Sequence, residues 1–511
     1  MASNATAPVV GSASRKMIFG QPRGLPTLFF TEMWERFSFY GMRALLPLYL
    51  IAGGPSAAAG SQGHGLAMTT ANAVAITSLY MAMVYLPCIG GGWLGDRLWG
   101  PRRTVIVAGM LVILGHLLLA VPGYPSFFIG LALVAIGSGL LKPNISTLVG
   151  HLYEGPDDPR RDGGFTIFYM GINLGGLLAP LVIGTVGQQV SWHLGFTLAA
   201  AGMALGLVQF IVCTRHLNRA GDVVPKRLAP GELAPVVRKF LMYLAIAAAG
   251  YTALVLSGHY TMRWALVPLA LVGVGLPVGV LVRIKRDRGL KASEHTQLNR
   301  FIRFFIAAAV FWMIYDQGAS TMALFAAQHT SGSILGFAFP SSWMQSVNPL
   351  CIMALGPAFA GIWLWLARRR KEPSTASKFA MGLWLVGVSF IVFLVPMTMA
   401  ESGTSVSPMW LVSIYLIQTI GELCLSPVGL SVTTKMAPAK YASRMMGIWF
   451  LAATAGDCVA ALLTQAGADL STIPVVGVEG LLAALSGLVF LVWHKKAASG
   501  RVSPQWSRQW S

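Results

Sequence analysis

Four charged side chains stand in an otherwise apolar stretch near the start of the chain, and they are the first candidates for chemistry. The stretch 25–51 contains Glu32, Glu35, Arg36 and Arg43. It is long enough to cross a bilayer, which takes roughly 20 residues. Each charge costs roughly 2.5–3.5 kcal/mol at the centre of a membrane, so these side chains must face protein or water. Their spacing of three and four residues places them on one helical face, and we expect this polar face to have a function.

Length and composition place the chain among polytopic membrane proteins. Its 511 residues are 55% hydrophobic and only 11% charged, which is too apolar for a soluble protein of two or three domains. Apolar windows of about 20 residues predict an all-α protein with fourteen spanning helices, grouped as six, two and six. These windows lie near residues 28–51, 70–95, 102–121, 126–150, 164–187, 192–213, 238–257, 262–283, 299–327, 342–366, 378–399, 408–434, 442–468 and 474–494.

The windows divide the chain into two bundles and an insertion. A polar, basic segment with three prolines, 214–237, follows the sixth window and indicates a cytoplasmic linker. The next two windows carry no polar residue deep inside, so we assign this hairpin a packing role. The predicted parts are a cytoplasmic N-terminal tail at 1–24, a six-helix bundle at 25–215, the linker and hairpin at 216–297, a second six-helix bundle at 298–495 and a cytoplasmic C-terminal tail at 496–511.

The net charge of +19 does not point to nucleic acid. The basic residues form no patch with interleaved aromatics; they occupy alternate loops, with Arg263 as the exception. This distribution is the positive-inside signature and predicts a multi-pass protein of the cell membrane with both termini in the cytoplasm. The first 24 residues lack the apolar core of a cleavable signal peptide. We therefore expect the first helix itself to direct insertion.

The sequence offers no metal site, cofactor site or enzyme motif. The five cysteines lie in or at the ends of apolar windows without C-x-x-C spacing, which is typical of small core residues. Neither H-E-x-x-H nor G-x-S-x-G occurs. An intramembrane aspartyl protease built on Asp316 and Asp457 fails, because the second motif requires Gly-x-Gly-Asp and the chain has Thr-Ala-Gly-Asp at 454–457. We expect a protein that is not an enzyme.

The loop after the second window resembles the signature of the major facilitator superfamily. It reads Gly-Gly-Trp-Leu-Gly-Asp-Arg-Leu-Trp-Gly-Pro-Arg-Arg-Thr over residues 91–104. Glycines here allow two helices to approach closely. The matching loop of the second half keeps only the basic run 368–371, which is consistent with a decayed parallel repeat. The resemblance implies two six-helix bundles, with the hairpin as an addition.

Within that superfamily, the first helix resembles the E-x-x-E-R-F-x-Y-Y-G signature of the proton-coupled oligopeptide transporter (POT) family. The matching residues are Glu32, Glu35, Arg36, Phe37, Tyr40 and Gly41. Phe39 departs from the pattern, because it stands where the family usually has a tyrosine, so we expect any unusual selectivity to start there. Segments 164–176 and 421–429 resemble the other two signatures of the family.

The resemblance implies two gating ion pairs and a set of proton sites. Lys142 lies in apolar surroundings and needs an anion; the family pairs this position with that of Glu422 when the site is empty. Asp316 would pair with Arg43 on the outer side. The expected proton-coupling residues are Glu32, Glu35, Asp316 and Glu422.

The same resemblance implies a symporter that imports di- and tripeptides together with protons. A peptide is a zwitterion, so Arg36, Lys142 and Tyr40 would hold its carboxylate, and Glu422 would hold its amino group with Asn173 and Asn348. Tyr85, Trp312 and Trp449 are the further candidates for lining the site, and for the tryptophans plain helix packing is an equal alternative. Asp457 receives no role; it is either protonated or lines a water-filled path. We expect the chain to function as a monomer in the lipid bilayer.

Two other functions stay open. One is a facilitator of nitrate or another small anion, or a drug-type transporter, on the same scaffold. The pairing of Arg36 and Lys142 with Glu422 favours a zwitterion instead, because a pure anion site gains nothing from a carboxylate. The other is a peptide-sensing receptor without transport, although no signalling domain is evident in the sequence.

Overall fold

The computed structural model describes residues 17–18, 20–54, 63, 65–154, 158–217, 221–222, 224, 227–229, 231–334 and 336–499. Thirteen helices in this part of the chain are long and apolar enough to cross a membrane. Helix α1 (Gly24–Ile51) is the fourteenth, with 28 residues. It differs from an ordinary spanning helix in carrying four charged side chains, Glu32, Glu35, Arg36 and Arg43. The chain is a multi-pass membrane protein with the predicted number of helices.

The first bundle is built from six spans, three of which are interrupted or extended by short turns. Its elements are α1, α2 (Thr70–Tyr85) with α3 (Cys88–Leu94) and η1 (Gly95–Trp99), α4 (Pro101–Leu119), α5 (Tyr124–Gly150), α6 (Arg161–Ala179) with η2 (Pro180–Gly184) and α7 (Thr185–Gln189), and α8 (Trp192–Cys213) with η3 (Thr214–His216). A short antiparallel pair, β1 (Met17–Ile18) and β2 (Gln21–Pro22), precedes it.

The second bundle follows the hairpin of α9 (Leu233–Leu256) and α10 (Arg263–Lys285). Its elements are α11 (Ala292–Tyr315), η5 (Asp316–Ala319) and α12 (Thr321–His329), the pair β3 (Ser333–Ile334) and β4 (Phe337–Ala338), η6 (Ser341–Ser346) with α13 (Val347–Arg368), α14 (Thr375–Glu401), α15 (Met409–Met436), η7 (Ala439–Tyr441) with α16 (Ala442–Gln465), and α17 (Ile473–Ser499). The ninth predicted span is therefore not continuous, because a 3-10 turn at Asp316 interrupts it.

The glycines of the 91–104 loop allow the close helix contact that the motif indicated. A side chain at Gly91 would meet the backbone of Leu140 on α5 at 2.7 Å. Asn144, one turn further along α5, donates a hydrogen bond of 2.8 Å to the Gly91 carbonyl. The small residue thus brings α3 against the helix that carries Lys142.

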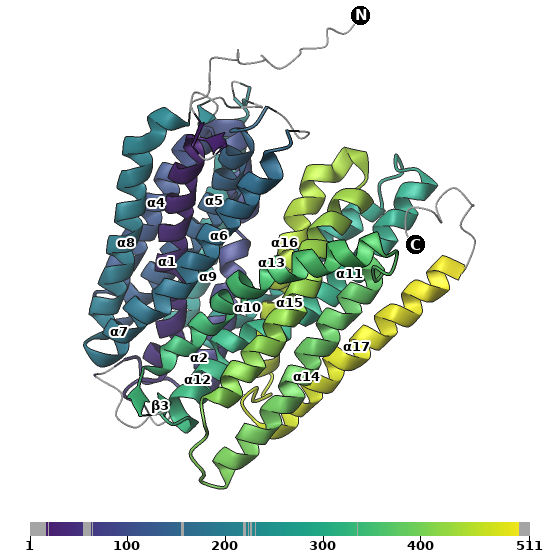
Figure 1. Ribbon diagram of the computed structural model, residues 1–511. Coiled ribbons are helices and arrows are strands. Elements are labelled where there is room, and N and C mark those ends of the chain that lie inside the picture. The colour runs from purple at the N-terminus through teal and green to yellow at the C-terminus, as the bar shows by residue number, and fades with distance from the viewer. Residues whose placement is uncertain are drawn as a thin grey trace, which may run out of the picture.

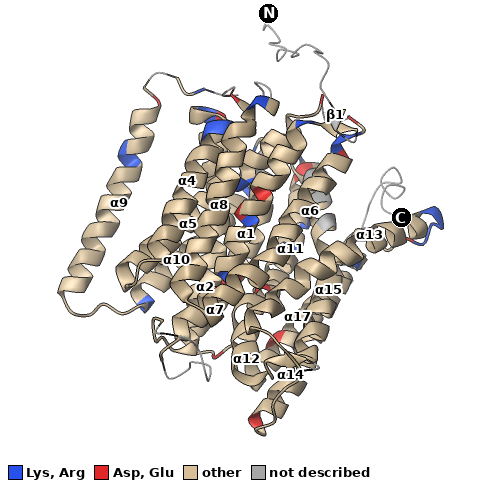
Figure 2. Cartoon of the chain, turned by 60° about the vertical axis from the view of Figure 1, so that its left-hand side comes forward, with Lys and Arg blue, Asp and Glu red and all other residues tan. Residues whose placement is uncertain are grey.

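The two helices of the hairpin differ in their surroundings. None of the 24 residues of α9 is buried, and Figure 2 shows this helix standing apart from the bundles. α10 packs against α16 at Gly273, close to Thr454 and Cys458. Beyond its end, Asp287 accepts hydrogen bonds of 2.6 Å from both Lys440 and Tyr441. The expected packing role thus falls on α10.

The two bundles meet through polar contacts at the end of the molecule that carries α7, α12 and β3, at the bottom of Figure 1. The positive-inside distribution predicts that this end faces away from the cytoplasm, and we therefore call it the outer end and the opposite one the inner end. Gln188 donates to Ser341 over 2.9 Å, and Trp343 donates to Thr185 over 2.8 Å. Figure 2 shows Lys and Arg concentrated at the opposite ends of the helices, while a few charges of both signs lie inside the protein around α1.

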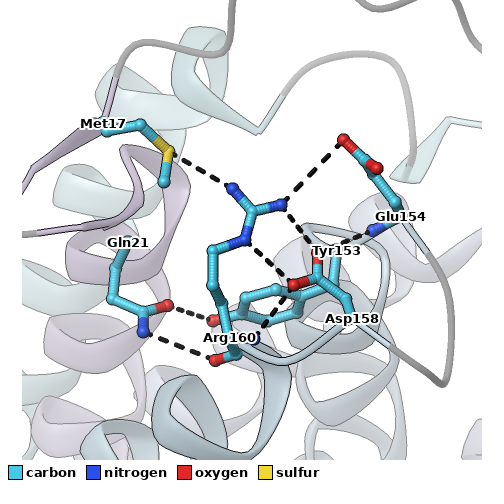
Figure 3. Close-up of polar contacts among 6 residues, drawn as sticks. All are labelled: Met17, Gln21, Tyr153, Glu154, Asp158 and Arg160. Carbon is cyan, nitrogen blue, oxygen red and sulfur yellow. Dashed lines mark hydrogen bonds and ion pairs between the residues drawn. The ribbon is translucent and has the colours of Figure 1, made fainter.

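A cluster of polar contacts at the inner end joins the β1–β2 pair to the loop between α5 and α6 (Figure 3). Arg160 binds both carboxylate oxygens of Asp158, at 2.9 and 2.7 Å. These hydrogen bonds, with a further one from the Arg160 backbone, hold the pKa of Asp158 well below its usual range. Gln21 links the strands to this loop by donating to the Arg160 carbonyl and accepting from the Tyr153 hydroxyl.

Replacing Arg160 by Met should lower the thermal stability of the purified protein equally at about pH 5 and about pH 8. A carboxylate with a depressed folded-state pKa stabilises the fold above its unfolded pKa, about 3.9 for Asp, and this contribution is lost only as the pH falls through the folded value. Both pH values lie above that range. Thermal unfolding in detergent measures the effect, and Arg103→Met, at an exposed site on α4, is the control. A loss that differs between the two pH values would contradict this account of the Asp158 pKa.

Candidate functional site

The charges of α1 form a compact cluster on that helix. The Arg36 Nε lies 2.9 Å from a Glu32 oxygen, and an Arg36 terminal nitrogen pairs with Glu35. All three side chains are buried, with Glu35 fully so. Two carboxylates around one guanidinium leave an excess negative charge in a region where charge is costly. The cluster can therefore take up a proton and become neutral.

The ring of Phe39 lies close to two cations of the first bundle. Its ring centre is 5.3 Å from the Arg36 guanidinium carbon and 5.4 Å from the Lys142 ammonium. Lys142 also lies 3.8 Å above the ring of Tyr85. Such contacts contribute roughly 2 kcal/mol or more when desolvated. The Phe39 ring thus contacts both cations, and Lys142 also interacts electrostatically with Glu35 and Glu32.

Glu422 on α15 is held by two neutral donors. The Tyr315 hydroxyl donates to its Oε2 over 2.5 Å, and the Asn348 amide donates to the same oxygen over 3.1 Å. Asn348 is fixed in turn by a bond of 2.9 Å to Thr419. The ion pairs among the described residues do not include Lys142 with Glu422. The structure therefore does not bring these two residues together, because each is engaged within its own bundle.

Arg43 and Asp316 join the two bundles near the outer end. Their side chains approach to 3.5 Å, and both are largely buried. The guanidinium also lies 5.6 Å from the ring centre of Tyr40. Asp316 occupies the first position of η5, where the first helix of the second bundle is interrupted, and its carboxylate faces Arg43 of α1. This is the pairing that the sequence indicated.

The remaining predicted residues have neighbours mainly in their own bundles. The Asn173 amide donates 3.0 Å to the Tyr169 carbonyl on the same helix. Trp312 stacks edge-on with Phe311 and Tyr315. Trp449 is buried and packs edge-on against Phe301 and Phe379. For Trp449 the contacts observed are those of helix packing.

Sequence reasoning did not single out Glu479 on α17 or the hydrogen bond from Tyr315 to Glu422. Glu479 is 3% exposed and accepts a bond of 2.8 Å from Gln317. A lone glutamate in an apolar span was a usable signal. Asp457 is 1% exposed and interacts electrostatically with Asp316 and Arg43, so it belongs to the outer-end cluster.

No group of three or more His, Cys, Asp or Glu side chains in the described part of the chain is placed to hold a metal ion. What the site offers is a set of buried charges distributed over two bundles, with one ion pair between them. Groups of this kind exchange partners when protons bind or when the bundles move. Fold and site together define a secondary transporter of the major facilitator type.

Comparison with known proteins gives the family. The model of the POT family matches residues 102–478, and the chain belongs to this family of transporters. It is 41% identical over 495 residues to the uncharacterized transporter YclF of Bacillus subtilis (strain 168), covering 96% of this chain and 97% of the relative. It is 39% identical over 490 residues to the di-/tripeptide transporter of Lactococcus lactis subsp. cremoris, covering 94% and 97%. A crystal structure of the peptide transporter POT in complex with sulfate matches with a TM-score of 0.88 and 41% identity, covering 94% and 96%.

Replacing Arg43 by Ala should destabilise the protein by about 3–5 kcal/mol, because it leaves the buried Asp316 carboxylate without a cation. Asp316→Asn in the same chain should restore part of this loss, since the uncompensated charge disappears. Unfolding of the two single variants and the double variant measures the coupling. If the two single losses simply add in the double variant, the residues are not coupled.

Proposed function

We propose that the chain is a proton-coupled symporter that imports di- and tripeptides by alternating access. The observation that carries the proposal is the separation of charge across the centre of the protein. Lys142 and Arg36 belong to the first bundle, and Glu422 belongs to the second. A site with cations on one bundle and a carboxylate on the other suits a zwitterion, whose two ends then draw the bundles together.

The peptide carboxylate would bind Lys142 and Arg36, with Tyr40 as a further donor. Lys142 is suited to this role, because aromatic rings rather than a carboxylate hold it in this conformation. The peptide amino group would bind Glu422, with Asn173 and Asn348. Both neutral donors of Glu422 use Oε2, which leaves Oε1 for an ammonium. Contacts to the termini leave the peptide side chains free to vary beside Tyr85, Trp312 and Trp449.

Two relatives support peptides as the substrate class. The Lactococcus relative is named a di-/tripeptide transporter. Another POT family structure, 33% identical with a TM-score of 0.87, is described as a complex with a thioalcohol-conjugated peptide. The sequence match extends over nearly the whole chain in both cases, so the residues of the proposed site lie within the compared regions.

Proton coupling would use Glu32, Glu35, Asp316 and Glu422. Protonation of a carboxylate in an ion pair releases its cation, and the peptide carboxylate then competes for that cation. The membrane potential contributes about 2.3 kcal/mol per charge per 100 mV to inward proton movement. The two proposed gates would alternate: Arg43–Asp316 is formed here while Lys142–Glu422 is open, as expected with the outer end closed. The transporter would lie in the cell membrane as a monomer with both termini in the cytoplasm.

The decisive experiment is uptake of labelled dialanine into proteoliposomes under an inward proton gradient, with and without an uncoupler. We expect accumulation that requires the gradient and that unlabelled dialanine, but not nitrate, competes away. Uptake blocked by nitrate instead would favour an anion facilitator. Binding of dialanine without uptake would favour a receptor.

Replacing Glu422 by Gln should abolish gradient-driven accumulation of dialanine, because the amide keeps the size of the side chain but binds neither a proton nor an ammonium strongly. Tyr315→Phe is the matched variant, since it removes one donor and keeps the carboxylate. We expect it to retain accumulation with a changed KM. Unchanged accumulation in Glu422→Gln would remove Glu422 from the coupling scheme.

A further inference from the structure

Glu479 is a buried acid that the transport scheme above does not use. It lies near the outer end of α17, where Gly480 packs against Gly387 of α14. The residue is 3% exposed, and its Oε2 has no hydrogen-bond partner among the described residues. Its one observed contact is the 2.8 Å bond that its Oε1 accepts from the Gln317 amide. A carboxyl group in this position is expensive to maintain in a membrane span.

Gln317 connects this acid to the outer gate. It follows Asp316 directly in η5. Asp316 pairs with Arg43, and Gln317 donates its hydrogen bond to Glu479. The Gln317 side chain is oriented further by a 3.3 Å bond from Thr321. The next residue, Gly318, accepts from Gln345 and Tyr415 through its carbonyl. The hydrogen bond to Glu479 is therefore one of the contacts that position the turn carrying Asp316.

In the described part of the chain, no ion pair joins Glu479 to a cation that could balance an ionised carboxylate. The helices that pack most closely against α17 are α14 and α11. The charged residues of α14, Lys378 and Glu401, lie near its two ends. Those of α11 gather in its first turns, away from η5, and are Glu294, His295, Arg300 and Arg303. Asp316, which precedes Gln317 in the chain, pairs with Arg43. An ionised Glu479 would be an uncompensated buried charge.

We propose that Glu479 is a proton-binding residue behind the outer gate, which holds its proton while the gate is closed and positions Asp316 through Gln317. In the neutral form it holds the η5 turn by a single ordinary hydrogen bond. When the turn moves and water reaches the carboxyl group, the proton leaves Oε2 for that water. The resulting carboxylate binds Gln317 more strongly, because hydrogen bonds to charged acceptors are the stronger ones. The inference rests on the proposed proton-coupled transport and adds a site to it.

The protonation of Glu479 is measured by infrared spectroscopy of the full-length protein in liposomes at neutral pH. The spectrum of each variant is subtracted from that of the unmodified protein. We expect Glu479→Gln to lose one carbonyl-stretch band of a protonated carboxyl group. Glu401→Gln is the matched control, because Glu401 is exposed at the outer end of α14, and it should lose none. An unchanged spectrum in Glu479→Gln would overturn the proposal. This readout needs no transport, so it stands even if dialanine uptake fails.

The effect on coupling is measured by comparing gradient-driven accumulation of dialanine with its counterflow exchange across a pH series. Glu479→Gln should retain counterflow, since the amide keeps the shape and polarity of the neutral acid. Gradient-driven accumulation should fall at least about fivefold, the lower range of site coupling, with a flatter pH profile. Accumulation and a pH profile equal to those of the unmodified protein would overturn the proposal even if the infrared band is lost.

Two further variants separate proton binding from simple packing. Gln317→Leu should reproduce the coupling defect while leaving the infrared band in place, because it removes the hydrogen bond to Glu479 and leaves the Glu479 carboxyl group unchanged. Glu479→Leu should lose both the band and the counterflow, and Glu479→Gln should rescue the counterflow. If Glu479→Leu and Glu479→Gln behave alike in both transport assays, the role of the Glu479 side chain is limited to packing and the proposal fails.

Discussion

The cost of placing a charge inside a membrane determines the arrangement of this protein. Some buried charges are held by an opposite charge, as Arg36 is by Glu32, whereas Lys142 and Glu422 are held by aromatic and neutral groups. The ion pairs of the described residues include neither Lys142 nor Glu422. A ligand of opposite charge can therefore bind these two residues without first breaking an ion pair.

The interruption of the seventh core helix at η5 links Asp316 to contacts with several other helices. A continuous α-helix would hydrogen-bond its own backbone throughout, but here the Gly318 carbonyl is satisfied by side chains of η6 and α15. The turn depends on contacts to several helices instead of on its own ladder. A change at any of these contacts can therefore reach Asp316 without unfolding the helix.

Much of this architecture could be predicted from the sequence, because spanning length and loop charge are local properties. The fourteen spans and the polar face of α1 were evident from residue types and spacing, and the resemblance to the family implied the pairing of Arg43 with Asp316. The break at Asp316, the bond from Tyr315 to Glu422 and the position of Trp449 were not, since each depends on which helices pack together. The separation of Lys142 from Glu422 in this structure could not be predicted either, because it depends on the rings and neutral donors that the packing brings to each of them.

The exposure of α9 has a consequence for how this chain can be modified. None of its residues is buried, and the Tyr251 hydroxyl links it to the neighbouring helix by donating 2.7 Å to the Trp264 carbonyl of α10. The short connection from Ser257 to Met262 between α9 and α10 also becomes a natural place to graft a rigid protein tag, which would give this small membrane protein a visible landmark for electron microscopy.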